Sequence, residues 1–164
     1  MDFLEKNLED IIFETDNSLL QERGLEISGK KIRQLRIGNY GICDLITYDR
    51  DILFIGDHIK PVIQVNIYEL KKGEINTRSF IQCVGYARGI QRYLTARGAK
   101  FTMKITLIGS SLEKESGFNF LPNLFCSDKE YNIVSCIDLY TYEYKFDGIY
   151  FESKSGYKLI NEGF

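Results

Sequence analysis

Residues 62–71 have the sequence VIQVNIYELK, and this stretch decides the fold. It is rich in Val and Ile, so it predicts a long central β-strand. Its end carries Glu69 and Lys71, which are two positions apart and therefore project from one face of the strand, while Tyr68 and Leu70 project from the other. A carboxylate and an ammonium group at the end of an apolar strand are costly to bury unless they pair or bind something. This end of the strand is therefore the first candidate site.

The segments around this strand alternate between helical and extended patterns. Apolar spacing predicts helices over 3–14 and 79–97, with Gly98 as the stop of the second helix. Further strands are predicted over 31–37, 42–48, 102–109, 133–143, 146–152 and 156–160. Turns are predicted at 38–41, 49–51, 56–57, 147–148 and 155–156, and an irregular insertion at 110–130. This order predicts one mixed α/β domain over 1–164.

Composition narrows the class of protein. The chain has 164 residues, of which 44% are apolar and 27% charged, so it can bury a core and is not of the disordered or fibrous type. A single His excludes sites within one chain that need several histidines. The net charge is −2, but eight basic residues against one acid lie between Lys71 and Lys104. A neutral total therefore conceals a basic middle of the chain, followed by an acidic stretch over 113–152.

The location of the protein is inferred from its cysteines and its N-terminus. Four cysteines show no C-x-x-C spacing, which indicates reduced thiols. The N-terminus lacks the apolar run of a signal peptide, and no stretch approaches the roughly 20 apolar residues of a membrane span. We therefore expect a cytoplasmic protein with no membrane partner.

A second candidate acid lies in the predicted strand that precedes the central one. Asp44 lies inside the predicted strand 42–48, ICDLITY. If this strand pairs with 62–71, Asp44 and Glu69 converge, and two carboxylates side by side repel each other and raise a pKa. A divalent cation removes that conflict. Carboxylate oxygens favour Mg²⁺ or Mn²⁺, which keep open positions for phosphate and water.

These residues resemble a known signature. Asp44 followed by Glu69-Leu70-Lys71 resembles the D…(D/E)-x-K pattern of the PD-(D/E)XK nuclease superfamily. Gln82 and Tyr86 on the following helix are similar to the Q-x-x-x-Y motif of its RecB-type and NucS-like members, and Glu5 is similar to the glutamate of its first helix. The resemblance covers about residues 1–110. It implies a restriction-endonuclease-like core, a central mixed β-sheet flanked by helices, with residues 133–160 extending the sheet or forming an interface.

The chain departs from this pattern in two places. Cys43 stands where the signature has Pro, and 25 positions separate Asp44 from Glu69, more than in compact NucS-like domains. The surplus is placed in residues 49–61, as an extended hairpin or a loop. A loop there could prevent Asp44 from lying opposite Glu69.

The resemblance implies a role for each motif residue. Asp44, Glu69 and the Leu70 carbonyl would hold Mg²⁺ or Mn²⁺, Lys71 would orient the attacking water, and Glu5 would hold a second metal or a metal-bound water. Contacts to nucleic acid would come from Gln82, Tyr86, Arg88, Arg92 and Lys72. The expected activity is metal-dependent hydrolysis of phosphodiesters in DNA, at ends, single strands or branches. Members of the superfamily often dimerise, so a homodimer is a further expectation.

Each residue also has a structural interpretation. Glu69 and Lys71 could form a surface pair on an edge strand, and Asp44 could be a hydrogen-bonded structural residue. Glu5 could be present only because the macrodipole favours a glutamate near the N-terminus of a helix, and Glu9 is an alternative to it. The alternative function is a nuclease-like fold that binds nucleic acid or a protein without cutting, and an enzyme directed at RNA also stays open, as does cleavage at ends or within strands.

Overall fold

The computed structural model describes residues 5–114, 126–127 and 133–154. Its helices are α1 (Glu5–Glu14), α2 (Asn17–Glu22) and α3 (Thr77–Ala96), with a short 3-10 turn η1 (Gly38–Tyr40). Its strands are β1 (Lys30–Arg36), β2 (Ile42–Ile55), β3 (His58–Leu70), β4 (Glu74–Ile75), β5 (Phe101–Gly109), β6 (Ser111–Leu112), β7 (Cys126–Ser127), β8 (Ile133–Lys145) and β9 (Gly148–Ser153). The protein is therefore of the α/β class.

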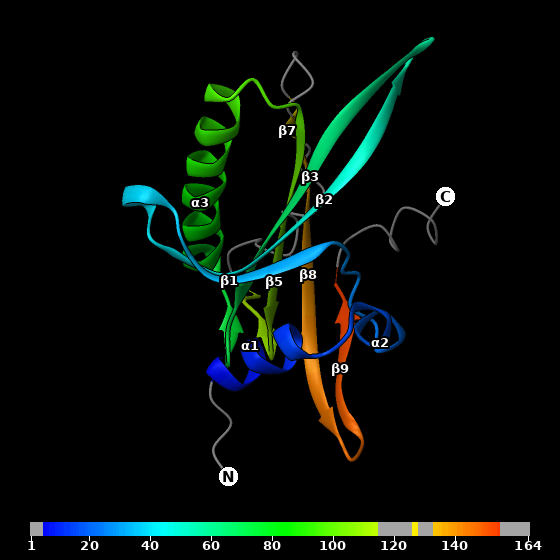
Figure 1. Cartoon of the computed structure of the whole chain (residues 1–164). Helices are drawn as coiled ribbons and strands as arrows, with labels where there is room; N and C mark the ends of the chain where they lie inside the picture. Colours follow the sequence, from blue (N-terminus) through cyan, green and yellow to red (C-terminus); the bar gives the residue numbers. More distant parts are fainter. Residues whose placement is uncertain (1–4, 115–125, 128–132, 155–164) are drawn as a thin grey trace, which may run out of the picture.

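The strands form one large mixed sheet (Figure 1). Within the described residues its order is β1-β2-β3-β5-β8-β7, with β9 also paired to β8, and β4 pairs β6 separately. β1, β2 and β3 are antiparallel, whereas β5 runs parallel to β3 and β8 parallel to β5. The change from antiparallel to parallel pairing follows from α3, which returns the chain across one face of the sheet before β5 begins. The strand that ends in Glu69 is thus central.

Two hydrophobic cores lie on opposite faces of the sheet. On one face, α3 contributes Cys83, Tyr86 and Ala87 to a core with Ile67 and other sheet residues. On the other face, α1 and α2 contribute Leu8, Ile12 and Leu20 to a core with Leu45, Tyr68, Leu70 and Tyr140. In Figure 1, α3 stands to the left of the strands, and α1 and α2 cross the lower part of the view. We refer to these as the α3 face and the α1 face.

The ends of α3 follow ordinary capping rules. The side chain of Asn76 accepts a hydrogen bond from the Ser79 N–H at 3.1 Å, which satisfies one of the first amides of the helix. Gly98 follows the last turn with φ +65°, a left-handed conformation that glycine adopts without strain. Helix α3 therefore begins two residues earlier than the sequence predicts and stops at the predicted glycine.

Several local predictions were wrong. Residues 49–51 were predicted as a turn, yet they lie within β2, and the hairpin turn falls at Gly56-Asp57 as predicted. Residues 49–61 therefore form an extended hairpin, which projects away from the rest of the sheet (Figure 1). Helix α2 and strand β4 were not predicted, nor were the short strands β6 and β7, which lie inside the predicted irregular insertion over 110–130. The predicted strand over 156–160 and turn at 155–156 lie outside the described residues, as does most of the predicted insertion.

Candidate active site

The pairing of β2 with β3 brings the two predicted acids to the same level of the sheet. Leu45 is paired with Tyr68 in this antiparallel register. One position further along the pair, Asp44 on β2 therefore lies opposite Glu69 on β3. Asp44 is half-buried, and its Oδ2 accepts a hydrogen bond of 3.0 Å from the Leu70 N–H. The hairpin over 49–61 thus takes up the extra length between the two acids without disturbing their register.

Glu69 and Lys71 project together, as their spacing predicts. Lys71 Nζ lies 2.8 Å from Glu69 Oε1, and the side chain of Glu69 is only 1% exposed while that of Lys71 is 27% exposed. Tyr68 and Leu70 point into the core of the α1 face. Since β3 lies between β2 and β5, the alternative of a surface pair on an edge strand is wrong.

Asp44 and Glu69 both raise the pKa of three groups on the α3 face: two thiols and one phenol. Burial raises the pKa of the Cys83 thiol, and the Glu69 and Asp44 carboxylates raise it further. Burial likewise raises the pKa of the Cys43 thiol, again with contributions from both acids. For Tyr86, burial is the main cause of a raised pKa, and both carboxylates add to it. Asp44 and Glu69 therefore act on one shared environment, and both thiols stay protonated and buried there.

Gln82 and Tyr86 join the site to α3. Gln82 Nε2 donates a hydrogen bond of 2.6 Å to the Tyr86 hydroxyl, which in turn donates one of 2.8 Å to the Ile42 carbonyl. The predicted shared helical face is confirmed. Tyr86 is almost completely buried, however, so its hydroxyl holds the start of β2 in place, and Gln82 is the exposed member of the pair.

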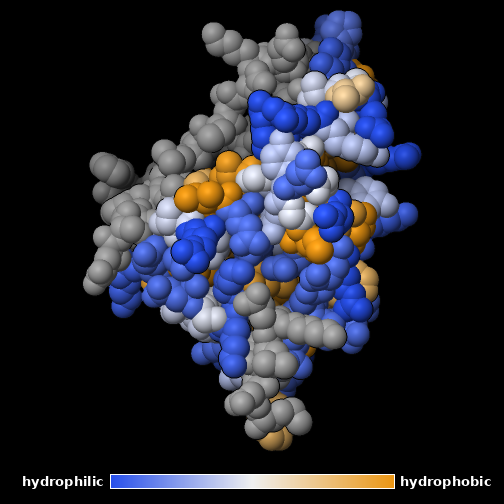
Figure 2. Space-filling model, turned by 90° about the vertical axis from the view of Figure 1, so that its left-hand side faces the viewer, coloured by the Kyte–Doolittle hydropathy of each residue, from blue (hydrophilic) through white to orange (hydrophobic). Residues whose placement is uncertain are grey.

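The predicted basic residues are all exposed. Arg88 and Arg92 are exposed on α3, and Arg88 donates a hydrogen bond of 3.1 Å to Gln91 Oε1. Lys72 is exposed directly after β3, where its carbonyl accepts from the Tyr142 hydroxyl at 2.7 Å. Seen from the α3 side, the surface is dominated by hydrophilic side chains with scattered apolar ones (Figure 2).

Glu9 connects the first helix to strand β1. Glu5 is the first residue of α1. Glu9, which is 8% exposed, accepts a hydrogen bond of 2.6 Å from Gln34 Nε2. Gln34 lies on β1 at the position level with Asp44, and it has φ +52°, an uncommon conformation for a residue other than glycine. Strain of this kind is concentrated at functional sites. The alternative acid of the sequence analysis is thus connected to the strand beside Asp44.

A pocket that the sequence analysis missed lies next to Tyr86. It has a volume of about 570 Å³ and is lined by Arg36, Gly38, Asn39, Tyr40, Gly41, Ile42, Gln82 and Tyr86. We call it the η1 pocket, because η1 forms one wall. The only sequence signal is a tyrosine between two glycines, GNYG over 38–41. The pattern predicts a turn, but the wall it forms depends on the contact with α3.

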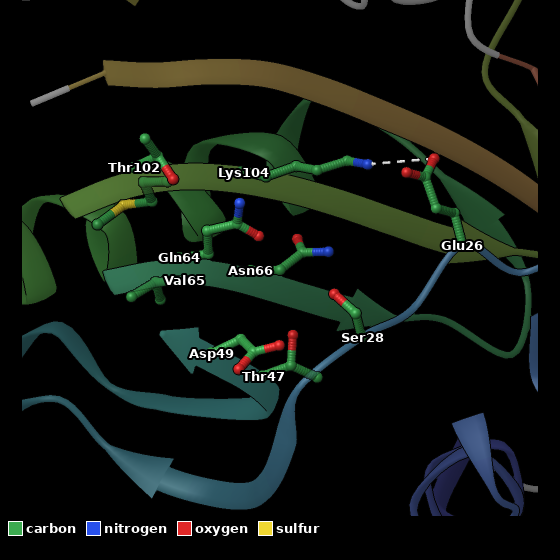
Figure 3. Close-up of a pocket in the computed structure, with 10 residues that line it drawn as sticks. Glu26, Ser28, Thr47, Asp49, Gln64, Val65, Asn66, Thr102 and Lys104 are labelled. Atoms are coloured by element: carbon green, nitrogen blue, oxygen red, sulfur yellow. Dashed lines mark ion pairs between the residues drawn. The ribbon is translucent and has the colours of Figure 1, made fainter. Parts of the chain in front are cut away.

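A second cavity, of about 180 Å³, opens on the α1 face (Figure 3). Polar side chains of three neighbouring strands line it, together with two residues of the segment before β1: Thr47, Asp49, Gln64, Asn66, Thr102, Lys104, Glu26 and Ser28. Lys104 points toward Glu26 at 3.6 Å and also pairs with Asp138. This cavity lies on the opposite side of the sheet from Glu69.

The carboxylates of Asp44 and Glu69 are the candidate ligands for a divalent cation. Among the described residues, three or more His, Cys, Asp and Glu side chains do not gather around a metal-sized position. Asp44 and Glu69 occupy opposite positions on the paired strands β2 and β3, and Asp44 Oδ2 accepts a hydrogen bond from the Leu70 N–H. Mg²⁺ is commonly held by one or two protein carboxylates, with water and phosphate completing its octahedron, so these two acids are the candidate ligands.

Comparisons with known proteins give no relative for this chain. No family model matches the sequence, and neither a curated protein nor a solved structure is significantly similar to it. Within the described residues, the helices are too short or too polar to cross a membrane. What the fold and the site define is an α/β protein with two carboxylates and a lysine at the end of its central strands.

Proposed function

We propose that the protein is a metal-dependent nuclease of the PD-(D/E)XK type that hydrolyses phosphodiester bonds in DNA. One observation carries the proposal: Asp44 lies level with the buried Glu69 on the paired strands β2 and β3, and Lys71 projects beside it. The order of α1, three antiparallel strands, α3 and a parallel strand supports a restriction-endonuclease-like core.

Each residue of the candidate site has a separate role in this proposal. Asp44, Glu69 and the Leu70 carbonyl would hold Mg²⁺ or Mn²⁺, which supplies a Lewis acid for the phosphate and a more acidic water. Lys71, held by Glu69, places a positive charge where a phosphate oxygen gains negative charge. Tyr86 fixes the start of β2 and with it the position of Asp44. Arg88, Arg92 and Lys72 offer charge to the backbone of the nucleic acid, and Gln82 offers its amide.

The proposal is tested by a cleavage panel. Linear and closed-circular DNA, single-stranded and double-stranded, and RNA of the same sequence are incubated with Mg²⁺ or Mn²⁺. We expect cleavage of DNA that falls by about 10³-fold in Glu69→Gln, since the carboxylate charge at the metal is lost. Glu74→Gln, which changes an exposed acid five residues further on, is the matched control and should cleave normally. Full activity in EDTA or in Glu69→Gln contradicts the proposal.

A second candidate is a nuclease-like fold that binds without cutting. It is favoured by the internal pairing of the site, since Glu69 pairs with Lys71 and the Tyr86 hydroxyl is hydrogen-bonded to Ile42 and Gln82. Titration of Mn²⁺ by calorimetry separates the two. An enzyme should give heat that disappears in Glu69→Gln, whereas a pure binder should give no heat that depends on this carboxylate.

A further inference from the structure

The η1 pocket is built by two glycines that allow η1 to approach α3. A Cβ atom on Gly89 would lie 2.5 Å from Ile37 Cγ2 and 2.7 Å from Tyr40 Cδ2. Gly41 has φ +117°, and a Cβ there would lie 3.1 Å from the Tyr86 ring. Side chains at these positions would push η1 away from the helix. The two glycines therefore fix the wall of the pocket against α3.

The wall is also held by its own hydrogen bonds. The Ile37 N–H donates to the Gly41 carbonyl at 2.8 Å, and the Tyr40 N–H donates to the Ile37 carbonyl at 2.8 Å. Despite this rigid backbone, the Tyr40 side chain is 37% exposed and Ile42 is 46% exposed. An exposed aromatic ring on a fixed turn is pre-organised for stacking, because little conformational freedom remains to be lost on binding.

The chemistry of the lining indicates the class of ligand. Among the described residues that line the pocket there is one cation, Arg36, and no carboxylate, while Asn39 and Gln82 contribute amides. A guanidinium group suits a phosphate, an aromatic ring suits a nucleobase, and amides suit the polar edge of a base. These three features together describe one nucleotide of a nucleic acid.

We propose that the η1 pocket binds an unpaired nucleotide of the substrate, with its base stacked on Tyr40 and its phosphate near Arg36. This inference rests on the proposed nuclease function, because Tyr86 is shared between the pocket and the surroundings of Asp44. A base within a duplex has both faces covered by its neighbours, whereas an unpaired base can turn a free face toward the Tyr40 ring. The pocket thus directs the site toward single strands, frayed ends or branches.

The test is a binding measurement in EDTA, where hydrolysis is suppressed. The full chain is titrated into a fluorescein-labelled single strand of about 12 thymidines, at one salt concentration, and fluorescence anisotropy gives Kd. We expect Tyr40→Ala to raise Kd about tenfold, and Tyr40→Phe, which keeps the ring, to change it less than twofold. Tyr48→Ala is the matched control, since Tyr48 is exposed to a similar extent, 38%, and does not line the pocket.

A blunt duplex of the same length is the second arm. Its Kd should change less than twofold in Tyr40→Ala. The inference is overturned if Tyr40→Ala binds the single strand as the natural protein does, if the duplex loses affinity equally, or if the natural protein does not bind the single strand. If single-strand binding depends on Tyr40 but no DNA is cleaved, only the proposed nuclease activity is contradicted. If cleavage depends on Glu69 but single-strand binding does not depend on Tyr40, only the proposed role of the η1 pocket is contradicted. Thermal unfolding confirms that each variant is folded.

Discussion

Two lysine–carboxylate clusters lie on opposite faces of the same sheet. On the α3 face, Lys71 pairs with Glu69 at the end of β3. On the α1 face, Lys104 on β5 pairs with Asp138 on β8 and lies 3.6 Å from Glu26 (Figure 3). The residue types are the same, and both lysines are about three-quarters buried, with exposed fractions of 27% and 21%. The difference between the clusters lies in what surrounds them.

A chain of hydrogen bonds lies beside the Lys104 cluster, and its member Asn66 lines the same cavity as Lys104. Thr106 Oγ1 donates to Asn66 Oδ1 at 3.1 Å, and Asn66 Nδ2 donates to the Tyr68 hydroxyl at 2.6 Å. Asn66 and Thr106 lie on the neighbouring strands β3 and β5, and each finds its partner among the side chains of the sheet itself. The cavity beside them carries the acids Glu26 and Asp49, which repel an anionic ligand.

The Lys71 cluster lies where β3 ends and the chain turns away. Asp44 on β2 lies level with Glu69, and Tyr86, whose hydroxyl is bonded to the start of β2, also lines the η1 pocket. Glu69 is 1% exposed and Asp138 is 15% exposed, so burial of the acid does not separate the two clusters. The second carboxylate, Asp44, which lies level with Glu69 on the paired strand, therefore distinguishes the candidate active site from the structural network of the α1 face.

The largest expected effect comes from exchanging each lysine for methionine. Lys71→Met should lower DNA cleavage by about 10²-fold or more, because a positive charge next to the phosphate is lost. Lys104→Met should leave cleavage within threefold and instead lower the free energy of unfolding by about 1–3 kcal/mol, because Asp138 loses its cation in a partly buried place. Initial cleavage rates and urea unfolding measure the two effects.

The opposite result would contradict the assignment of the active site to the Lys71 cluster. If Lys104→Met abolished cleavage while its stability was unchanged, the polar cavity of the α1 face would be the functional site. If both variants cut normally, neither lysine would take part in the reaction.

A smaller effect is expected from removing one hydroxyl on each face. Tyr86→Phe loses the hydrogen bond to the Ile42 carbonyl and should lower cleavage about tenfold, since the start of β2 then holds Asp44 less firmly. Tyr68→Phe loses the partner of Asn66 and should lower stability by about 1 kcal/mol with cleavage unchanged. Equal cleavage by the two variants would show that the hydroxyl of Tyr86 does not position the site.

The candidate site could be predicted because it depends on local geometry. Alternation along a strand placed Glu69 and Lys71 together, and antiparallel pairing carried Asp44 to their level. The four-residue spacing of Gln82 and Tyr86 likewise placed them on one helical face. The alternation and the helical spacing needed no knowledge of distant contacts, whereas the level of Asp44 depended on the pairing of β2 with β3, which the sequence left open.

The missed features depend on contacts across the fold. Asp49 and Asp51 resemble turn residues, but the ribbon of β2 and β3 accommodates them, and Asp51 accepts a hydrogen bond from Gln64 on the partner strand. Helix α2 has six residues, too few for a periodic signal, and is held by the burial of Leu20. Tyr40 forms a pocket only because Gly89 lets η1 approach α3. Such tertiary effects override local pattern.

The smallest effect concerns alkaline pH and the α1 face. Burial raises the pKa of Tyr140, and the Asp138 carboxylate raises it further, above the ordinary value of 10.0. Near pH 10 the folded protein therefore keeps this proton while the unfolded chain releases it. The contribution of Tyr140 to the free energy of unfolding is complete below about pH 10 and is lost as the pH rises toward the folded pKa.

Tyr140→Phe removes this proton, so the free energy of unfolding of the variant should fall less steeply between pH 10 and 11. The difference in slope is at most about 1.4 kcal/mol per pH unit. Urea unfolding at pH 9, 10 and 11 measures the slope, with Tyr48→Phe, at an exposed position, as the control. Identical slopes for Tyr140→Phe and the natural protein would mean that burial and the Asp138 carboxylate do not raise the pKa of Tyr140 in the folded protein.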